Sequence, residues 1–379
     1  MRVLQVITSL RTGGAEHIVV QLAERLVLQG ECCDICVFDG CDAPFMQEVA
    51  RFNSGLHGGN AIRIIKLGRH VYNPLLIIRL ARLIRGYDVV HTHNSSPQLF
   101  VAAAALLTCG RVPVLCTTEH STSNRKRAWR WYAPIESWMY SRYDHVVCIS
   151  RIAEEKLRAY MGGKWLDESS ESFGKITTIN NGVDVEAIRT AEPAADLMRL
   201  KEGRRAIVMV AGFREAKDQD TLVRAMSRLD RTAFELWLVG VGERMDYMRR
   251  LVGRYRLEDR VRFLGLRMDV PQVLRAADVV VMSSHWEGLS LSNVEGMSAG
   301  KPFIASCVNG LREVTEGYGM VFREEDDRQL AALVESLAED QRLYRQVAQR
   351  CYERACQFDI NKMVNSYKTV YVEQLIARQ

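Results

Sequence analysis

The sequence predicts an α/β protein made of two domains, each with a doubly wound parallel sheet. The chain has 379 residues, which is too long for one ordinary domain and suits two. Short apolar strand patterns alternate with helix patterns, as expected for a sheet covered by helices on both faces. After a boundary near 185–203, this alternation starts again with a strand at Arg205–Ala211.

The composition is that of a soluble globular protein. Hydrophobic residues make up 47% and charged residues 26%, and the net charge of +5 is too small to indicate a nucleic-acid partner. No apolar run approaches the roughly 18 residues of a membrane span, and the first residues read as a strand rather than a signal peptide. Most of the ten cysteines fall within predicted elements, which favours buried thiols in a reducing compartment. We therefore expect a cytoplasmic protein that can act at the inner face of the membrane.

The first strand, Arg2–Thr8, is followed by Gly13 and Gly14 and by a helix pattern from His17 to Gln29. Adjacent glycines allow backbone N–H groups to approach a phosphate at a helix N-terminus, although tight packing explains them equally well. The spacing is not Gly-x-Gly-x-x-Gly, so a dinucleotide fingerprint is missing. Further elements are expected at Cys33–Phe38, Ile62–Leu67, Pro74–Ile84, Asp88–Thr92, Gln98–Leu107 and Val112–Thr117.

Three histidines follow or end predicted strands of this half. His91 and His93 have a spacing that could hold a metal, but no third ligand is grouped nearby, so a loop role is favoured. His120 follows the next strand and could either cap a loop or face a ligand.

Residues 124–142 combine five basic residues with one acid and with interleaved aromatic rings. Basic and interfacial aromatic side chains suit a membrane surface or an acceptor. An ordinary half-exposed helix and an RNA-stacking surface are the alternatives, and no recognisable RNA-binding module supports the second. The candidate acceptor or membrane residues are Arg125, Lys126, Arg127, Trp129 and Trp131.

A strand at Tyr143–Ser150, a helix at Ile152–Tyr160 capped by Ser150 and a strand at Ile176–Ile179 complete the first half. In the second half, Arg214 and Lys217 follow the strand Arg205–Ala211, where cations would hold a diphosphate, although a solvated turn is the alternative. Asp218 and Asp220 resemble a metal-binding pair, but at a helix start they are better explained as capping residues.

The segment 277–307 contains a strand at Asp278–Ser284, a loop with Glu287, a helix opened by Ser292–Glu295 and a strand at Pro302–Ser306. Loops at the carboxyl ends of parallel strands line ligand crevices, so Glu287 and Glu295 can face one ligand. A carboxylate can accept from two neighbouring hydroxyls of a sugar, and a helix N-terminus favours phosphate. A nucleotide sugar fits this pattern. The alternative is that Ser292-x-x-Glu295 forms a capping box only.

The two glutamates with seven residues between them resemble the Glu-x7-Glu signature of retaining glycosyltransferases of family four. That family has the GT-B fold, in which two Rossmann-like domains are separated by a cleft. Gly13-Gly14-Ala15-Glu16, Asn181-Gly182-Val183-Asp184 and Lys217 also resemble family motifs, so the likeness covers nearly the whole chain. It implies an acceptor-side domain at 1–185, a nucleotide-sugar-binding domain at 203–360, and a final helix within 361–379 that packs back on the first domain.

The resemblance also implies roles for individual residues. Glu287 would meet the transferred sugar, Glu295 the nucleotide ribose, and His120 the donor sugar; His120, Lys217 and Glu287 form the expected catalytic set. The family usually has an arginine five residues before the lysine, where this chain has Gly212, and Arg214 is a substitute. The expected donor-binding residues are Gly13, Gly14, Arg214, Lys217, Gly240, Gly242, Gly288, Leu289, Ser290 and Glu295.

The expected function is transfer of a sugar, with retention, from a UDP or GDP sugar to a glycan or lipid-linked acceptor in cell-surface polysaccharide biosynthesis. Family analogy implies front-face attack, in which the departing diphosphate takes the acceptor proton and Lys217 offsets its charge. No metal or other cofactor is expected. The alternatives are a nucleotide-sugar epimerase or dehydrogenase, which would need an acid–base set or dinucleotide fingerprint, and a non-catalytic carbohydrate- or membrane-binding module. The sequence leaves open the donor, the acceptor, the linkage and the oligomeric state.

Overall fold

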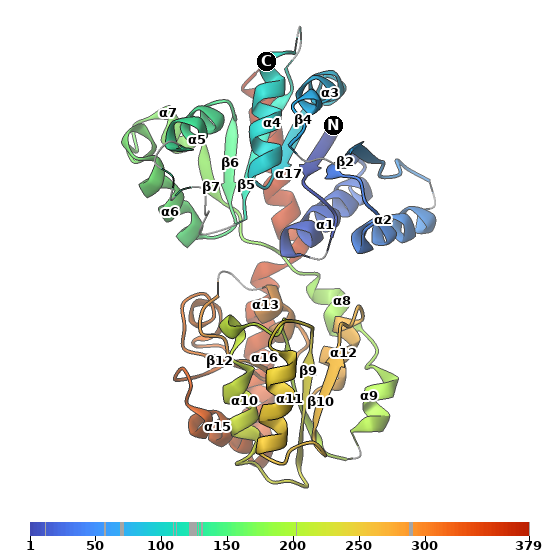
Figure 1. Ribbon diagram of the computed structural model, residues 1–379, viewed down its shortest axis with the longest axis vertical. Coiled ribbons are helices and arrows are strands. Elements are labelled where there is room, and N and C mark those ends of the chain that lie inside the picture. The colour runs from blue at the N-terminus through green and yellow to red at the C-terminus, as the bar shows by residue number, and fades with distance from the viewer. Residues whose placement is uncertain are drawn as a thin grey trace. The chain divides into compact units, whose positions relative to one another are not determined.

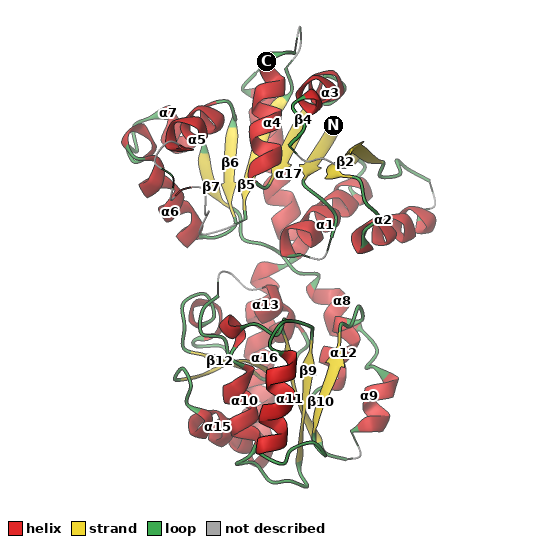
Figure 2. Ribbon diagram, viewed as in Figure 1, coloured by secondary structure: helices red, strands yellow, loops and turns green. Residues whose placement is uncertain are grey.

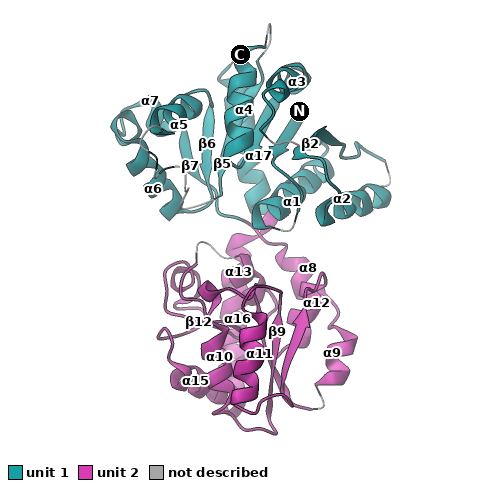
Figure 3. Cartoon of the chain, viewed as in Figure 1, with its two compact units in different colours: residues 1–181, 361–379 teal, residues 182–360 magenta. Residues whose placement is uncertain are grey.

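The computed structural model of the chain describes residues 1–379 except for a few short segments. These are Thr12, His57, 69–71, Cys109, Arg111, 121–126, Ala128, 130–131, Glu202, 288–290 and Gln379. The described chain divides into two compact units, of which unit 1 contains 1–181 and 361–379 and unit 2 contains 182–360 (Figure 3).

Unit 1 is built on a seven-stranded parallel sheet with the order β3-β2-β1-β4-β5-β6-β7. Most of its central strands are buried on both faces, which explains their apolar composition. The strands are β1 (Arg2–Ile7), β2 (Cys32–Asp39), β3 (Ile64–Gly68), β4 (Val89–His93), β5 (Val114–Glu119), β6 (His145–Cys148) and β7 (Ile176–Thr178).

Helices lie on both sides of the strands of this unit (Figures 1 and 2). Each connects one strand to the next, as parallel strands require. They are α1 (Gly14–Leu28), α2 (Pro44–Gly55), α3 (Leu75–Ile84), α4 (Ser95–Leu106), α5 (Tyr132–Ser141), α6 (Arg151–Met161), the short helix η2 (Gly163–Trp165) and α7 (Glu171–Gly174).

The last helix, α17 (Ile360–Ile376), returns to unit 1 from the far end of the sequence (Figure 3). Its Tyr367 and Tyr371 are fully buried there, and Lys368 pairs with Glu31 at 2.7 Å. One face of this helix therefore completes the core of unit 1, and its opposite face is exposed.

Unit 2 has a six-stranded parallel sheet with the order β10-β9-β8-β11-β12-β13. One continuous apolar core surrounds it and includes the buried rings of Trp237, Phe213 and Phe303. The strands are β8 (Arg205–Val210), β9 (Phe234–Val239), β10 (Val261–Gly265), β11 (Val279–Met282), β12 (Phe303–Ser306) and β13 (Met320–Phe322).

The helices of unit 2 again cover both faces of its sheet (Figure 2). They are α8 (Val185–Thr190), α9 (Ala195–Leu200), η3 (Glu215–Lys217), α10 (Gln219–Met226), α11 (Met245–Arg254), α12 (Val270–Ala276), α13 (Leu291–Ser298), α14 (Arg312–Thr315), α15 (Asp327–Glu339), α16 (Gln341–Ala355) and η4 (Cys356–Phe358).

The predicted fold class is confirmed, because both units are doubly wound parallel α/β structures. The sequence analysis did not predict the strand β13 or the helices α7, α12, α14, α2, α8 and α9. The last two lie in 185–203, which was taken as an interdomain boundary, whereas they pack in unit 2 against α12 and α13. The predicted N-cap of α6 is present, since the Ser150 hydroxyl accepts a hydrogen bond from Ala153 N at 3.2 Å.

Candidate functional site

The candidate site of unit 2 lies where the strand order of the sheet reverses. β8 and β11 are neighbours, with β9 and β10 beyond one and β12 and β13 beyond the other. In open parallel sheets, ligands bind outside the carboxyl ends of the strands at such a switch point. Lys217 follows β8 and Glu287 follows β11, so this topology brings the two side chains to one place.

Lys217 and Glu287 form an ion pair across the two loops, through Lys217 Nζ and Glu287 Oε1. The Ser284 hydroxyl donates to the same carboxylate oxygen at 2.9 Å. Both ionic side chains are largely buried, with exposed fractions of 22% for Lys217 and 10% for Glu287. The surrounding protein therefore holds this ion pair in a fixed position.

The two loops are also fastened to each other through backbone groups. His285 N donates to Ala216 O at 2.9 Å, and the Ser283 hydroxyl donates to Asp218 O at 2.7 Å. Ser306 Oγ, from β12, donates to Ser284 O at 2.6 Å. These bonds connect β8, β11 and β12 beyond their carboxyl ends and give the loops a rigid frame.

Arg214 is exposed and lies beside the glycine where a family arginine is expected. A Cβ added to Gly212 would be 4.0 Å from Arg214 Nε. The Arg214 side chain thus lies close to the space that a side chain at position 212 would occupy. This geometry makes the substitution of one arginine by the other physically reasonable.

Glu295 is the fifth residue of α13 and is partly buried. Burial raises the pKa of its carboxyl group to about 7. Within the described part of the chain, no cation pairs with Glu295 and no group donates to it. An ionised carboxylate in this position is short of partners, as expected for a group that receives them from a ligand.

The capping-box interpretation of Ser292 and Glu295 is not supported. α13 begins at Leu291, so Ser292 is already inside the helix and cannot serve as its N-cap residue. The helix packs tightly below Glu295, since a Cβ on Gly296 would approach the Phe303 ring to 2.7 Å. Gly288, Leu289 and Ser290, which were expected to bind the donor, lie outside the described residues.

Gly240 and Gly242 form the loop after β9 and touch the loop after β8. A Cβ on Gly240 would lie 2.2 Å from Ala211 O, and one on Gly242 would lie 2.4 Å from Phe213 O. Gly240 also has a φ of 135°, which side-chain-bearing residues rarely adopt. Close backbone packing is therefore sufficient to explain both glycines, and direct contact with a donor stays a prediction.

Asp218 and Asp220, which resemble a metal-binding pair, have separate structural partners. Asp218 is the N-cap of α10 and accepts from Thr221 N at 3.2 Å. Asp220 pairs with Arg244 at 3.0 Å. In the described residues, no cluster of three or more histidine, cysteine, aspartate or glutamate side chains has the geometry of a metal site.

In unit 1, Gly13 and Gly14 stand at the start of α1, directly after the β1 loop. A Cβ on Gly13 would lie only 2.2 Å from Glu16 Oε2, so the Glu16 carboxylate folds back over Gly13. Burial raises the pKa of this carboxyl group. The helix N-terminus predicted to meet a phosphate is thus covered by a side chain of its own first turn.

His120 follows β5 and is bonded to His93, with 2.8 Å between His120 Nε2 and His93 Nδ1. The predicted loop role for His91 and His93 is wrong, because both are fully buried residues of β4. His93 Nε2 in turn lies 2.9 Å from Gln5 Oε1 of β1. Gln5 was missed by the sequence reading, although a polar residue in an otherwise apolar strand is a usable signal.

The basic aromatic segment does not present all of its charge to solvent. Arg127 is buried in a cluster with two carboxylates, 3.1 Å from Glu119 and 3.2 Å from Glu136. Its charge is neutralised internally, so the prediction that Arg127 contributes to a cationic surface is corrected. Trp129 is half exposed. The remaining candidates, Arg125, Lys126 and Trp131, lie outside the described residues.

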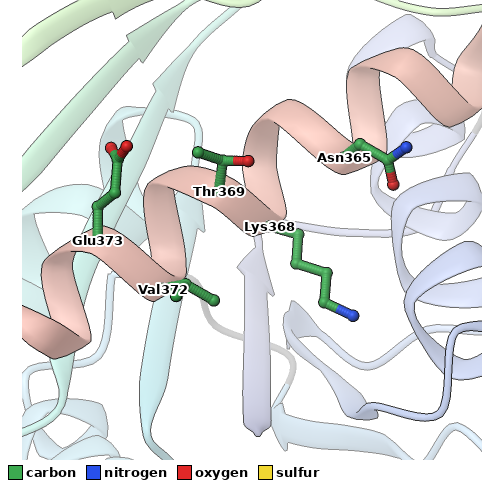
Figure 4. Close-up of a pocket in the computed structure, with 5 residues that line it drawn as sticks. All are labelled: Asn365, Lys368, Thr369, Val372 and Glu373. Atoms are coloured by element: carbon green, nitrogen blue, oxygen red, sulfur yellow. The ribbon is translucent and has the colours of Figure 1, made fainter.

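A shallow cavity of about 370 Å³ lies along α17 and is separate from all predicted site residues (Figure 4). It is lined by Asn365, Lys368, Thr369, Val372 and Glu373. Two of these side chains already have partners, since Lys368 pairs with Glu31 and Asn365 accepts from Gln29. The predicted catalytic residues are distributed differently, with His120 in unit 1 and Lys217 and Glu287 in unit 2.

Two protein-family models match successive parts of the chain. The model described as Glycosyltransferase Family 4 matches residues 12–187, and the model described as Glycosyl transferases group 1 matches residues 197–355. Together they span most of the sequence and meet near the boundary between the units.

Individual relatives agree with these matches. The UDP-Gal:alpha-D-GlcNAc-diphosphoundecaprenol alpha-1,3-galactosyltransferase of Escherichia coli is 26% identical over 320 residues, which is 79% of either chain. The glycogen synthase of Mycobacterium tuberculosis is 27% identical over 300 residues, 75% of this chain and 68% of that protein. The crystal structure of Anabaena Alr3699/HepE with UDP-glucose superimposes with a TM-score of 0.78 at 20% identity and covers 100% of both chains.

None of the described helices combines the length and the apolar character needed to span a membrane.

The raised pKa of Glu295 predicts a pH-dependent gain in stability for Glu295→Gln. A carboxyl group with a folded-state pKa near 7 and an ordinary unfolded value of 4.5 destabilises the fold progressively as pH rises through that window. Glutamine carries no such penalty. We expect melting temperatures of the two proteins to agree near pH 4.5 and the variant to melt a few degrees higher at pH 8. Thermal unfolding across this range is the measurement, and equal melting temperatures at pH 8 would show that the carboxylate is not desolvated.

Proposed function

The chain belongs to glycosyltransferase family four and has the GT-B fold, and on that premise we propose that it transfers a sugar from a nucleotide-diphosphate sugar with retention of configuration. The observation that carries this proposal is the pairing of Lys217 with Glu287 at the switch point of unit 2. One cation for a diphosphate and one carboxylate for sugar hydroxyls stand side by side there.

Each group at this site has a distinct chemical task. Lys217 offsets the negative charge that develops on the departing diphosphate, and Arg214 adds a second positive charge from the same loop. Glu287 accepts hydrogen bonds from the transferred sugar. Glu295, whose carboxylate has no partner among the described residues, accepts from two hydroxyls of the nucleotide ribose.

The reaction proceeds by front-face attack. The bond between the anomeric carbon and the diphosphate oxygen breaks, and the acceptor oxygen bonds to the same face of that carbon. The acceptor proton passes to the departing diphosphate oxygen, so no protein nucleophile is consumed. Lys217 and Arg214 supply the positive charge that a metal ion supplies in other enzymes, and we propose that no metal is required.

The relatives favour a UDP sugar as donor and a lipid-linked or glycan acceptor. The Escherichia coli relative is named for a UDP-galactose donor and a diphosphoundecaprenol acceptor, and the Anabaena structure is a complex with UDP-glucose. An epimerase of similar fold would change the sugar without releasing the nucleotide. A non-catalytic module would turn over no nucleotide sugar.

A membrane-facing surface would suit a lipid-linked acceptor, and α3 supplies one. Tyr72, Leu75 and Ile78 expose 74%, 63% and 48% of their area. Arg82 and Arg85 are exposed on the same short segment, and no acidic residue occurs from position 72 to position 86. Exposed apolar side chains next to unopposed arginines suit a bilayer with anionic lipid. We call these five residues the α3 surface.

The proposed transfer is tested by incubating the full chain with UDP and GDP sugars and measuring released nucleotide diphosphate and transfer to a glycan or lipid-linked acceptor, with and without EDTA. We expect one donor class to be consumed in both conditions. Loss of activity in EDTA that manganese or magnesium restores would contradict the metal-free mechanism. Interconversion of the sugar without release of nucleotide would favour the epimerase, and no turnover of any donor would favour the binding module.

Glu295→Gln should lower kcat/KM for the donor by at least about tenfold at pH 8, the cost of losing a charged hydrogen-bond acceptor. The difference from wild type should shrink below pH 7, because the wild-type carboxyl group is then protonated. Glu335→Gln, at an exposed position of α15, is the control. It should leave kcat/KM for the donor unchanged both at pH 8 and below pH 7. Equal donor kinetics at pH 8 would exclude the ribose contact.

Two variants that move the arginine from position 214 to position 212 test whether Arg214 substitutes for an arginine at position 212. Arg214→Ala should lower kcat by at least about tenfold with a smaller change in KM, because the charge acts on the leaving diphosphate. Adding Gly212→Arg to this variant should restore most of the rate, since both positions open to the same space. A double variant that stays as slow as Arg214→Ala would argue against equivalence.

Membrane contact predicts that Arg82→Glu with Arg85→Glu lowers binding to vesicles containing anionic lipid by at least about tenfold at low salt. The matched control is Arg250→Glu with Arg254→Glu, which changes the net charge equally at exposed positions of α11. Vesicle co-sedimentation is the measurement. Equal losses of vesicle binding in the two double variants would contradict a role for the α3 surface. Absence of vesicle binding by the wild-type protein would contradict it as well.

A further inference from the structure

A chain of buried polar side chains lies at the switch point of the sheet in unit 1, where β1 and β4 are neighbours. Its members are Gln5, His91, His93, Thr118, His120, Tyr367 and Tyr371. All are fully buried except His120, which is partly exposed. Burying so many polar groups is costly unless each has a partner, and here they partner one another.

One end of this hydrogen-bonded network is His120, the histidine expected to contact the donor sugar. Gln5 Oε1 lies 2.9 Å from His93 Nε2, and His93 Nδ1 lies 2.8 Å from His120 Nε2. His93 thus connects Gln5 of β1 to His120, which lies just beyond the carboxyl end of β5.

The other end is anchored on α17. Gln5 Nε2 donates to the Tyr371 hydroxyl at 3.4 Å, and the Gln5 side chain also bonds the Cys33 thiol. The Tyr371 hydroxyl lies 2.5 Å from His91 Nδ1. Because the hydroxyl accepts from Gln5, it can donate to His91. The structure has the amide nitrogen of Gln5 on the Tyr371 side and its oxygen on the His93 side.

The lowered pKa values of the three histidines favour the neutral imidazole at pH 7. Burial lowers the pKa of His91 and His93 well below the ordinary value, and it lowers the pKa of His120 to about 4. A neutral imidazole carries one proton on one of its two nitrogens. The partner of one ring nitrogen therefore determines what the other nitrogen can do.

The positions of protons follow from Gln5. An amide oxygen only accepts, so His93 Nε2 carries the proton and donates to it. His93 Nδ1 is then bare and accepts from His120 Nε2–H. His120 Nδ1 is bare in turn and can only accept.

We propose that Gln5 and His93 are positioning residues that hold His120 in the Nε2–H tautomer, so that His120 Nδ1 accepts a hydrogen bond from a hydroxyl of the transferred sugar. This inference rests on the proposed function and on the role that the family resemblance implies for His120, which is contact with the donor sugar. It assigns a task to two buried residues that touch no substrate. The wrong tautomer would place an N–H group against the sugar and lose the bond.

The tautomer is measured directly on the full chain with ¹⁵N-labelled histidine, by long-range ¹H–¹⁵N correlation spectra at pH 7. His120→Gln and His93→Asn provide the assignments. We expect His120 and His93 to be Nε2–H tautomers in wild type. Gln5→Leu, which does not touch His120, should leave His120 with a mixture of tautomers. A wild-type His120 protonated on Nδ1 overturns the proposal.

Kinetics with a series of donors, each lacking one sugar hydroxyl, test the consequence for function. Wild type should use one of these donors about tenfold less well than the intact donor, the scale of one hydrogen bond. His93→Leu should lower kcat/KM for the intact donor by a similar factor and lose that discrimination. His93→Asn should recover most of the kcat/KM for the intact donor and most of the donor discrimination, because its side-chain oxygen can accept from His120 Nε2–H.

Tyr143→Phe is the matched control for a lost buried hydrogen bond. The Tyr143 hydroxyl bonds to Thr92 Oγ1 at 3.0 Å and to Gln98 O at 2.8 Å, and it has no bond to the histidine chain. This variant should keep the His120 tautomer and the donor discrimination. Full activity and discrimination in His93→Leu would overturn the proposal. Wild-type protein that turns over no nucleotide sugar would overturn the proposed function, whereas the spectra would still decide the tautomer.

Discussion

The parallel pairing of β8 with β11 is the constraint on which the candidate site of unit 2 depends. These strands are adjacent in the sheet although Ala206 and Asp278 are far apart in sequence. Their pairing places two loops next to each other, and backbone bonds such as His285 N to Ala216 O then fix the distance between the loops. Lys217 and Glu287, one from each loop, form an ion pair within this frame. Rigid placement of opposite charges is what electrostatic catalysis requires.

Unit 1 applies the same topological rule with different chemistry. At its switch point, β1 and β4 contribute neutral amide and imidazole groups instead of an ion pair. A network of neutral groups can be buried at little electrostatic cost and still transmit an orientation, because each donor fixes the next acceptor. One unit therefore presents charge at its strand ends, and the other presents a directed hydrogen-bond acceptor.

The sequence predicted the fold and the charged half of the site for physical reasons. Alternating strand and helix patterns indicate parallel sheets, and side chains in the loops after neighbouring strands, such as Lys217 and Glu287, are brought together by the strand order. Gln5 was overlooked and His93 was assigned to a loop, because the local sequence does not show which distant side chains these two residues contact. Those partners can be very distant in sequence, as Tyr371 is from Gln5. Arg127 was misread for the related reason that local composition does not show that Glu119 and Glu136 neutralise it. Ser292 matched a capping pattern, but only the actual first residue of α13 decides which residue caps it.

The return of α17 to unit 1 has a consequence for biosynthesis. Unit 2 is continuous in sequence, so it can fold as soon as residue 360 has left the ribosome. Unit 1 is different, because its sheet must wait for Tyr367 and Tyr371 before the polar groups of β1 and β4 are fully paired. During translation the earlier segment would lack the Tyr371 partner of His91 and the Tyr367 partner of Thr118, and such a state opens more easily. Removal of α17 would therefore destabilise unit 1 more than unit 2, although unit 2 directly precedes this helix in the sequence.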